Sequence, residues 1–175
     1  MRGTGSSARN KFENRAGEIP PFSYGGNMDR TETALRYFLE GYNCAQSVFA
    51  AYCDLWGVSA ADGLRLTAGM GGGMGGLREK CGTLSACFLL AGLKYGDYAA
   101  SDHESKKKLY ALIQQMDRAF SERFGDTKCS ELLKRAKAVF SSIPAKRDAA
   151  YYASRPCSKF VEGACEIVEH FLVED

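Results

Sequence analysis

Long apolar runs are missing from this sequence. No apolar segment reaches the ~18 residues that a membrane-spanning helix requires. The N-terminal residues also lack the charged start, the apolar core and the small-residue cleavage site of a secretory signal peptide. These absences exclude the usual sequence signatures of a membrane span and of secretion. We therefore expect a soluble, cytoplasmic protein.

Clusters of positive charge and strand-like alternation are also missing. The formal net charge is +2, and the one basic run, Lys106-Lys107-Lys108, contains no aromatic residue. Such a run is typical of a solvated helix face, so no nucleic-acid partner is expected. No segment alternates between apolar and polar residues with the period of two that marks a half-buried strand. The expected fold class is therefore all-α.

Apolar residues recur instead at the three- and four-residue intervals of amphipathic helices. The clearest stripe runs from Leu109 to Phe124 and is followed by Gly125, a residue that commonly ends helices. The pattern predicts a single-domain bundle of about six to seven helices over residues 28–175. The individual helices are expected over residues 29–41, 43–57, 59–68, 81–96, 101–125, 126–143 and 154–172.

Residues 1–27 differ in composition from the rest of the chain. They are rich in Gly, Ser, Arg and Asn and show no apolar periodicity. Such a segment cannot bury enough apolar surface to fold, and we expect a disordered N-terminal arm. Because Met28 opens the patterned region, residues 1–27 are expected to be a leader or an extension from an upstream start.

Glycine is concentrated in residues 69–76, where six of the eight residues are glycine. Each glycine inside a helix costs roughly 1 kcal/mol relative to alanine, and glycine has no side chain to pack in a strand. The segment is therefore predicted to be a loop that turns tightly or approaches another group closely. It leads to Cys81-Gly82, and we expect it to present Cys81 to a small polar site.

Seven cysteines is a high number for a chain of this kind, and the count is odd. None of them are spaced as CxxC, and a secreted disulfide scaffold is normally smaller and evenly counted. In a reducing compartment, several cysteines indicate metal or redox chemistry instead. Some of them could also be small core residues.

Four of the cysteines lie at or just inside predicted helix N-termini: Cys44, Cys81, Cys129 and Cys157. Free N–H groups and the helix dipole stabilise a thiolate at a first turn, and the thiolate is the form that attacks disulfides and binds metals. These four are the predicted catalytic residues or metal ligands. The other three lie later in helices and are expected to pack as small apolar residues: Cys53, Cys87 and Cys165.

The long and irregular separations between the four cysteines do not define a metal site by themselves. If the four thiols converge in space, either a structural zinc or an iron–sulfur cluster suits them. If they converge only in pairs, a dithiol/disulfide couple is the simpler chemistry. Two further hypotheses remain. The chain could be a non-catalytic, zinc-stabilised helical module that binds another protein, or a structural domain whose cysteines stay reduced and pack in the core.

A resemblance to a known family rests on these same residues. The segment from Gly41 to Val48 (GYNCAQSV), the glycine-rich loop with Cys81-Gly82 and two single downstream cysteines resemble the redox-active protein family named for its C_GCAxxG_C_C cysteine pattern. The resemblance spans about residues 28–172. The family's usual Ala and Gly after the second cysteine are Thr83 and Ala86 here, and both are also small.

The resemblance implies a redox role for the four cysteines, whose order in the family is matched by Cys44, Cys81, Cys129 and Cys157. Members of the family are generally bacterial or archaeal. The chain is also similar to the part of split-Soret cytochromes that carries an iron–sulfur centre, which implies that the same four residues are cluster ligands. No CxxCH haem-attachment site is present, so the haem half of that comparison does not apply.

The leading expectation is therefore a small helical oxidoreductase or electron carrier with an iron–sulfur cofactor held by the four cysteines. The glycine loop would bring backbone N–H groups near the sulfur atoms and tune their potential. The expected cofactor-binding glycines are Gly73, Gly75, Gly76 and Gly82. The expected partner is an unidentified redox protein, and a homodimer is left open. The alternatives remain a thiol–disulfide protein without metal and a zinc-stabilised interaction module.

Overall fold

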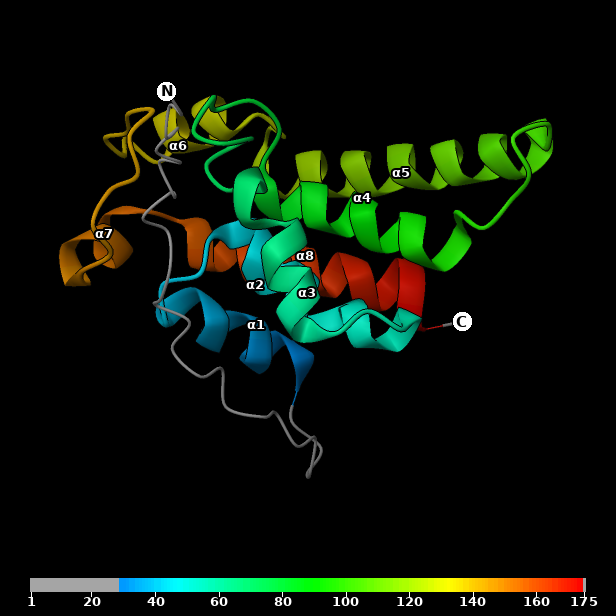
Figure 1. The fold of residues 1–175 in the computed structure, drawn as a ribbon. Coiled ribbons are helices and arrows are strands. Elements are labelled where there is room, and N and C mark those ends of the chain that lie inside the picture. The colour runs from blue at the N-terminus through cyan, green and yellow to red at the C-terminus, as the bar shows by residue number, and fades with distance from the viewer. Residues whose placement is uncertain (1–28, 175) are drawn as a thin grey trace, which may run out of the picture.

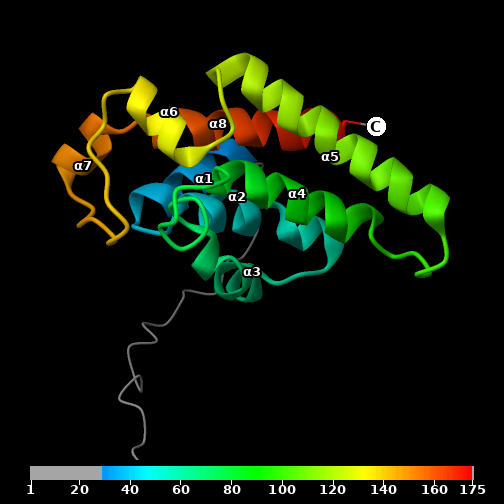
Figure 2. The same ribbon diagram turned by 90° about the horizontal axis from the view of Figure 1, so that it is seen from above.

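The computed structural model describes residues 29–174, and Figures 1 and 2 show them in two views. The arm expected at residues 1–27 lies outside the described residues. Within residues 29–174 the chain forms eight α-helices and no strand, so the all-α fold class is confirmed. The α-helices are α1 (Arg30–Leu39), α2 (Cys44–Tyr52), α3 (Ala60–Leu66), α4 (Gly82–Tyr95), α5 (His103–Phe124), α6 (Cys129–Arg135), α7 (Ala149–Ser154) and α8 (Cys157–Val168). Shorter helical turns are η1 (Cys53–Trp56), η2 (Ala68–Met70) and η3 (Glu169–Val173).

Helix α8 packs against four other helices, α1, α2, α4 and α5. Its buried residues recur at the three- and four-residue spacing of an amphipathic helix, as in Phe160, Ala164 and Ile167. The Phe160 ring lies 5.0 Å from that of Phe124 and 6.1 Å from that of Phe120, measured between ring centroids. Burial of a side chain of this size contributes about 1.5–3 kcal/mol, so these contacts hold α5 against α8.

Three of the four helices that begin at the predicted site cysteines, α2, α4 and α8, run in a common direction. Figures 1 and 2 show that α2, α4 and α8 begin at the same end of the molecule, where α6 and α7 also lie. The glycine-rich loop, residues 69–76, folds at that end just before α4. The first residues of several helices therefore lie close to one another, although they are far apart in the sequence.

The helix expected over residues 126–143 is shorter than predicted, because α6 covers only its first half. Lys137 has a φ of 55°, in the left-handed region that interrupts a helix. The carbonyl of Ser141 accepts a hydrogen bond from the Arg78 side chain, 3.0 Å from Nε, instead of from a helical N–H group. Val139, which completes the apolar spacing in the sequence, is 91% exposed. The residues after α6 therefore form an irregular connecting segment, residues 136–148.

The helix expected over residues 154–172 begins later, and a separate short helix precedes it. Asp148 caps that additional helix, α7, and Pro156 is the N-cap of α8, which begins at Cys157. Arg155 has extended backbone angles, as a residue before proline usually does. This extended residue separates α7, which the sequence pattern does not predict, from α8.

The glycine-rich loop is held in a left-handed turn. All residues from 72 to 76 have positive φ, including Met74 at 66°. This conformation costs roughly 1–2 kcal/mol for a residue with a Cβ, which explains why four of the five are glycine. The Arg78 N–H donates to the Gly72 carbonyl at 3.1 Å, so the loop folds back on itself. The predicted loop is confirmed.

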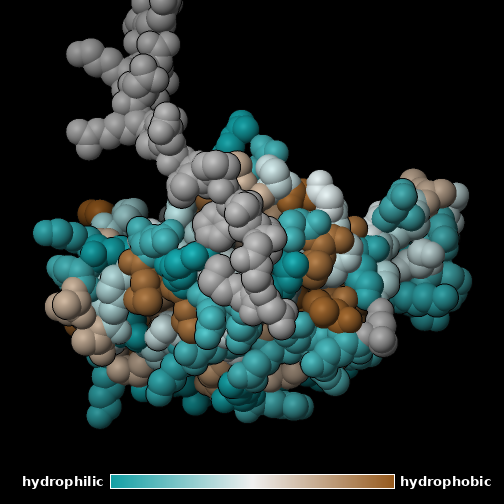
Figure 3. Space-filling model, turned by 90° about the horizontal axis from the view of Figure 1, so that it is seen from below, coloured by the Kyte–Doolittle hydropathy of each residue, from teal (hydrophilic) through white to brown (hydrophobic). Residues whose placement is uncertain are grey.

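The molecular surface carries small apolar patches between polar regions. On the face shown in Figure 3 several such patches lie among hydrophilic residues. Over residues 29–174, no helix has both the length and the apolar character that crossing a membrane demands.

Candidate functional site

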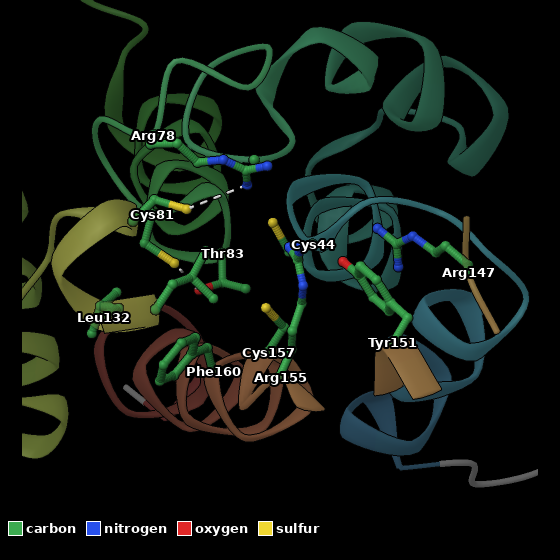
Figure 4. Close-up of a pocket in the computed structure, with 13 residues that line it drawn as sticks. Cys44, Arg78, Cys81, Thr83, Leu132, Arg147, Tyr151, Arg155, Cys157 and Phe160 are labelled. Atoms are coloured by element: carbon green, nitrogen blue, oxygen red, sulfur yellow. Dashed lines mark hydrogen bonds between the residues drawn. The ribbon is translucent and has the colours of Figure 1, made fainter. Parts of the chain in front are cut away.

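The four cysteines selected from the sequence line one cavity. Cys44, Cys129 and Cys157 are the first residues of α2, α6 and α8, and Cys81 is the N-cap of α4. The cavity between them has a volume of about 40 Å³. Figure 4 shows the sulfur atoms of Cys44 and Cys157 directed toward a common space, with Cys81 on its other side. The structure thus brings together all four predicted site residues.

The position of Cys44 is fixed by the cap of α2. The Asn43 side-chain oxygen accepts hydrogen bonds from the N–H groups of Ala45 and Gln46, both at 3.0 Å. The Gln46 side chain accepts one from the Asn43 N–H at 3.0 Å, which completes a capping box. The Asn43 amide also donates to the Ala68 carbonyl at 2.9 Å. This N-cap ties the start of α2 to the segment before the glycine loop.

Cys81 and Cys129 are brought together by pairing of their backbones. The Cys81 N–H donates to the Thr127 carbonyl at 2.8 Å, and the Cys129 N–H donates to the Glu79 carbonyl at 2.6 Å. An isolated antiparallel bridge lies between these two bonds. This short ladder joins the start of α4 to the start of α6, so the two cysteines share one wall of the cavity.

Two of the four predicted cofactor-binding glycines touch cysteine side chains. A Cβ added at Gly82 would lie 2.8 Å from the sulfur of Cys44. A Cβ added at Gly73 would lie 2.7 Å from the Cβ of Cys129. Real Cβ atoms are essentially never this close to another atom, so both positions require glycine for close packing at the cavity.

The other two glycines, Gly75 and Gly76, do not line the thiol cavity. Both line a neighbouring hollow of about 400 Å³. A Cβ at Gly76 would overlap the Ser142 carbonyl oxygen, so this glycine serves the contact with the connecting segment. Of the four glycines expected at a cofactor, the structure therefore places only Gly73 and Gly82 against cysteines.

The remaining three cysteines lie in the core. Cys53, Cys87 and Cys165 are each 0% exposed and are not among the residues that line the cavity. Burial is the main cause that raises the pKa of Cys53 to about 11 and that of Cys165 to about 12. Their placement agrees with the prediction that they pack as small core residues.

The protonation of the cavity cysteines differs from the sequence expectation. Burial, followed by the neighbouring Cys44 thiol, raises the pKa of Cys81 to about 12. Burial and the other three thiols raise the pKa of Cys157 well above its ordinary value. The pKa of Cys129 is raised by burial, against the opposing effect of Arg78, whose Nη1 lies 4.0 Å from the Cys129 sulfur. The expected thiolate stabilisation at a helix start is therefore wrong for these three, because desolvation outweighs it.

Three arginines at the cavity were missed by the sequence analysis: Arg78, Arg147 and Arg155. None of them forms an ion pair with a carboxylate of residues 29–174. They donate instead to backbone carbonyls, and Arg147 and Arg155 also lie over the ring of Tyr151. Carbonyls and rings do not neutralise a guanidinium, so positive charge remains beside the thiols. No motif in the sequence groups these arginines, because only the fold brings them together.

The thiols surround a space instead of meeting at a point. All seven cysteines are free thiols. Within residues 29–174, no three Cys, His, Asp or Glu side chains are placed to share a single metal ion. A tetrahedral zinc would need sulfur atoms at roughly 2.3 Å from one centre. The arrangement as it stands therefore does not match a preformed single-ion site.

We predict that Gly82→Ala destabilises the protein by about 1–3 kcal/mol, because the added methyl group overlaps the Cys44 sulfur and the Met70 carbonyl. Gly92→Ala, in the same helix α4, is the matched control, since its added Cβ meets nothing within 4 Å. The control should be stabilising by up to about 1 kcal/mol. Urea denaturation of both variants measures the difference. Equal effects of the two substitutions would show that Gly82 has no special packing role.

We also predict that the reduced, metal-free protein loses stability as the pH rises above about 9. The folded-state pKa of Cys81 is about 12, whereas an unfolded thiol deprotonates near its ordinary pKa of 9.0. The unfolded state therefore releases protons first, and the stability present below pH 9 declines toward pH 12. Thermal unfolding from pH 7 to 10.5 checks this. Cys81→Ser, which does not titrate there, should show a smaller decline, and an equal decline would contradict the raised pKa.

Comparison with known proteins identifies the family of this chain. Neither the curated proteins nor the solved structures gave a match to the chain. Residues 42–171 match the sequence model of a family described as "Putative redox-active protein (C_GCAxxG_C_C)". The matched range includes all four cysteines of the cavity and confirms the resemblance drawn from the sequence. The chain therefore belongs to the C_GCAxxG_C_C family of redox-active proteins.

Proposed function

We propose that Cys44, Cys81, Cys129 and Cys157 ligate an iron–sulfur cluster and that the protein transfers electrons. The observation that carries this proposal is that four thiols, each from a different helix start, line one cavity. A set of four cysteines is the usual ligand set of iron–sulfur clusters. Family membership supports the redox role but does not name a cofactor.

The placement of the four thiols around one cavity suits a cluster. In a [4Fe–4S] cluster each thiolate binds a different iron atom, so the sulfur atoms must surround a volume. A single ion requires all of its ligands around one point. The four thiols surround a cavity, and no three potential ligands among residues 29–174 are placed around a common ion. The ligand set therefore fits a cluster.

The charges around the cavity also suit a cluster. Four thiolates bring four negative charges, which are costly in a buried site unless positive groups lie nearby. Arg78, Arg147 and Arg155 line the cavity without a carboxylate partner among the described residues. Their charge would partly offset that of the thiolates, and Arg78 already lies beside the Cys129 sulfur.

The raised pKa values of the cavity cysteines are compatible with metal binding, and they make thiol–disulfide exchange less favourable. A metal ion displaces the proton of a coordinating thiol, so a protonated cavity can still be loaded. Thiol–disulfide exchange requires a thiolate before attack. With the pKa of Cys81 near 12 and that of Cys157 well above its ordinary value, little thiolate is present at neutral pH.

The protein's own residues have three roles in this proposal. The bound cluster would supply one-electron redox chemistry. The caps and backbone pairings described above hold the four sulfur atoms in place. Burial of Cys81, which is 4% exposed, keeps water from its sulfur, and the guanidinium of Arg78 donates toward Cys129. Such donors and low exposure are the features by which proteins set cluster potentials.

The test is the iron and acid-labile sulfide content of anaerobically prepared protein, together with its visible spectrum. We expect brown protein with both elements present, and loss of most of the iron and colour in Cys81→Ser and in Cys157→Ser. Cys53→Ala is the matched control, because Cys53 is equally buried but lies outside the cavity. Its iron content should be unchanged.

Other outcomes would contradict the cluster. Zinc without visible absorbance would favour the structural-site alternative. Protein that contains no metal after anaerobic preparation and iron–sulfide reconstitution would leave thiol–disulfide exchange as the next candidate. Equal loss of iron in the Cys53→Ala control would show that folding, and not ligation, explains the variants.

A further inference from the structure

A second hollow adjoins the thiol cavity and has a different chemical character. It has a volume of about 400 Å³ and lies between the glycine-rich loop, the start of α2, the connecting segment and α7. We name it the basic cleft. It shares five lining residues with the thiol cavity: Gly72, Arg78, Arg147, Tyr151 and Arg155. A molecule in the basic cleft would therefore lie next to the cysteines.

The charged side chains that line the basic cleft among residues 29–174 are all positive. Its lining includes three arginines and no Asp or Glu from residues 29–174. Two acids adjoin the lining arginines in the sequence, and both are engaged elsewhere. Asp148 caps α7, where it accepts the Tyr151 N–H at 3.0 Å. Glu79 pairs with Lys128 at 3.0 Å. No ion pair joins either acid to the lining arginines among the described residues. Three guanidinium groups that line one hollow, with no carboxylate partner among residues 29–174, suit an anion.

The guanidinium groups are arranged around the hollow and not stacked on one side of it. Figure 4 shows Arg78 on one side of Cys44, and Arg147 with Tyr151 on the other, with Arg155 next to Cys44 and Cys157. The side chains of all three arginines are half-buried. Contacts to carbonyls and to the Tyr151 ring hold them in place, so little ordering is needed when an anion binds.

The backbone of the glycine-rich loop adds neutral donors to the same hollow. Gly72 and Gly75 of the left-handed turn line the basic cleft, and their N–H groups donate to no acceptor within residues 29–174. Successive N–H groups in a left-handed turn of this kind form concave sites that suit anions. These donors supplement the guanidinium groups.

We propose that the basic cleft binds a small molecule that carries carboxylate or phosphate groups. The half-buried arginines inside a concave hollow suit a small anion, because the flat acidic surface of a protein could not reach all three. The bound molecule would lie beside the cysteines without displacing them. This inference goes beyond the proposed cluster and does not require it, since none of its contacts is a cysteine. The two proposals share the three arginines, so the negative charge of a bound cluster would weaken the binding of a second anion.

The test is isothermal titration of the purified, reduced full-length protein with inorganic phosphate, pyrophosphate and succinate at low ionic strength. We expect saturable binding of at least one of these probes at a single site. Arg147→Gln and Arg155→Gln should each weaken it about tenfold or more, because each removes a charged hydrogen bond. Lys107→Gln is the matched control, since Lys107 belongs to an exposed basic run outside the cleft and should leave binding unchanged.

A second measurement keeps the proposal testable if the arginine variants do not fold. In the wild-type protein, the amide NMR signals of Gly72 and Gly75 should shift on titration, and that of Gly92 should not. Absence of saturable binding to all three probes would overturn the proposal. Binding that survives both arginine substitutions, or shifts centred on Lys106–Lys108, would also overturn it, because the anion would then be held by surface lysines.

Discussion

Close approach of backbones at one end of the molecule is the constraint on which the candidate site depends. The start of α4 pairs with the start of α6 through the Cys81 and Cys129 N–H groups, and this pairing fixes two of the four sulfur atoms. Gly73 allows the loop to approach Cys129 at the start of α6, and Gly82 allows α4 to approach Cys44 at the start of α2, because a Cβ at either position would overlap a cysteine side chain. The glycine-rich loop is thus an element of the site's architecture, and its left-handed turn follows from the need to fit between α2, α4 and α6.

Most of the helices could be predicted from the sequence, because their caps and apolar stripes are set by residues close together in the chain. Asn43, Gly57 and Gly125 mark helix ends in the sequence, and each has that role in the structure. The errors occurred where side chains from distant parts of the sequence determine the backbone conformation. The connecting segment carries helical apolar spacing, but arginines from elsewhere in the chain bind its carbonyls. Local periodicity contains no information about such partners.

The candidate site shows the same division. The four cysteines could be selected from the sequence because helix starts are recognisable and thiols are chemically distinctive. Their raised pKa values could not, because desolvation depends on packing from other helices. The arginines were missed for a related reason. Arg78, Arg147 and Arg155 belong to three segments that no motif connects. That they meet at one cavity, with no carboxylate partner in the described part of the chain, is visible only in three dimensions.

The distribution of the cysteines over the chain has a consequence for biosynthesis. Cys44 opens the second helix, whereas Cys157 opens the last α-helix, and α8 is also the element against which α1, α2, α4 and α5 pack. The cavity therefore does not exist until the C-terminal part of the chain has left the ribosome and docked. Any loading of the thiols in their native arrangement must be post-translational. Until then, the growing chain exposes reduced cysteines one after another and depends on the reducing capacity of its surroundings.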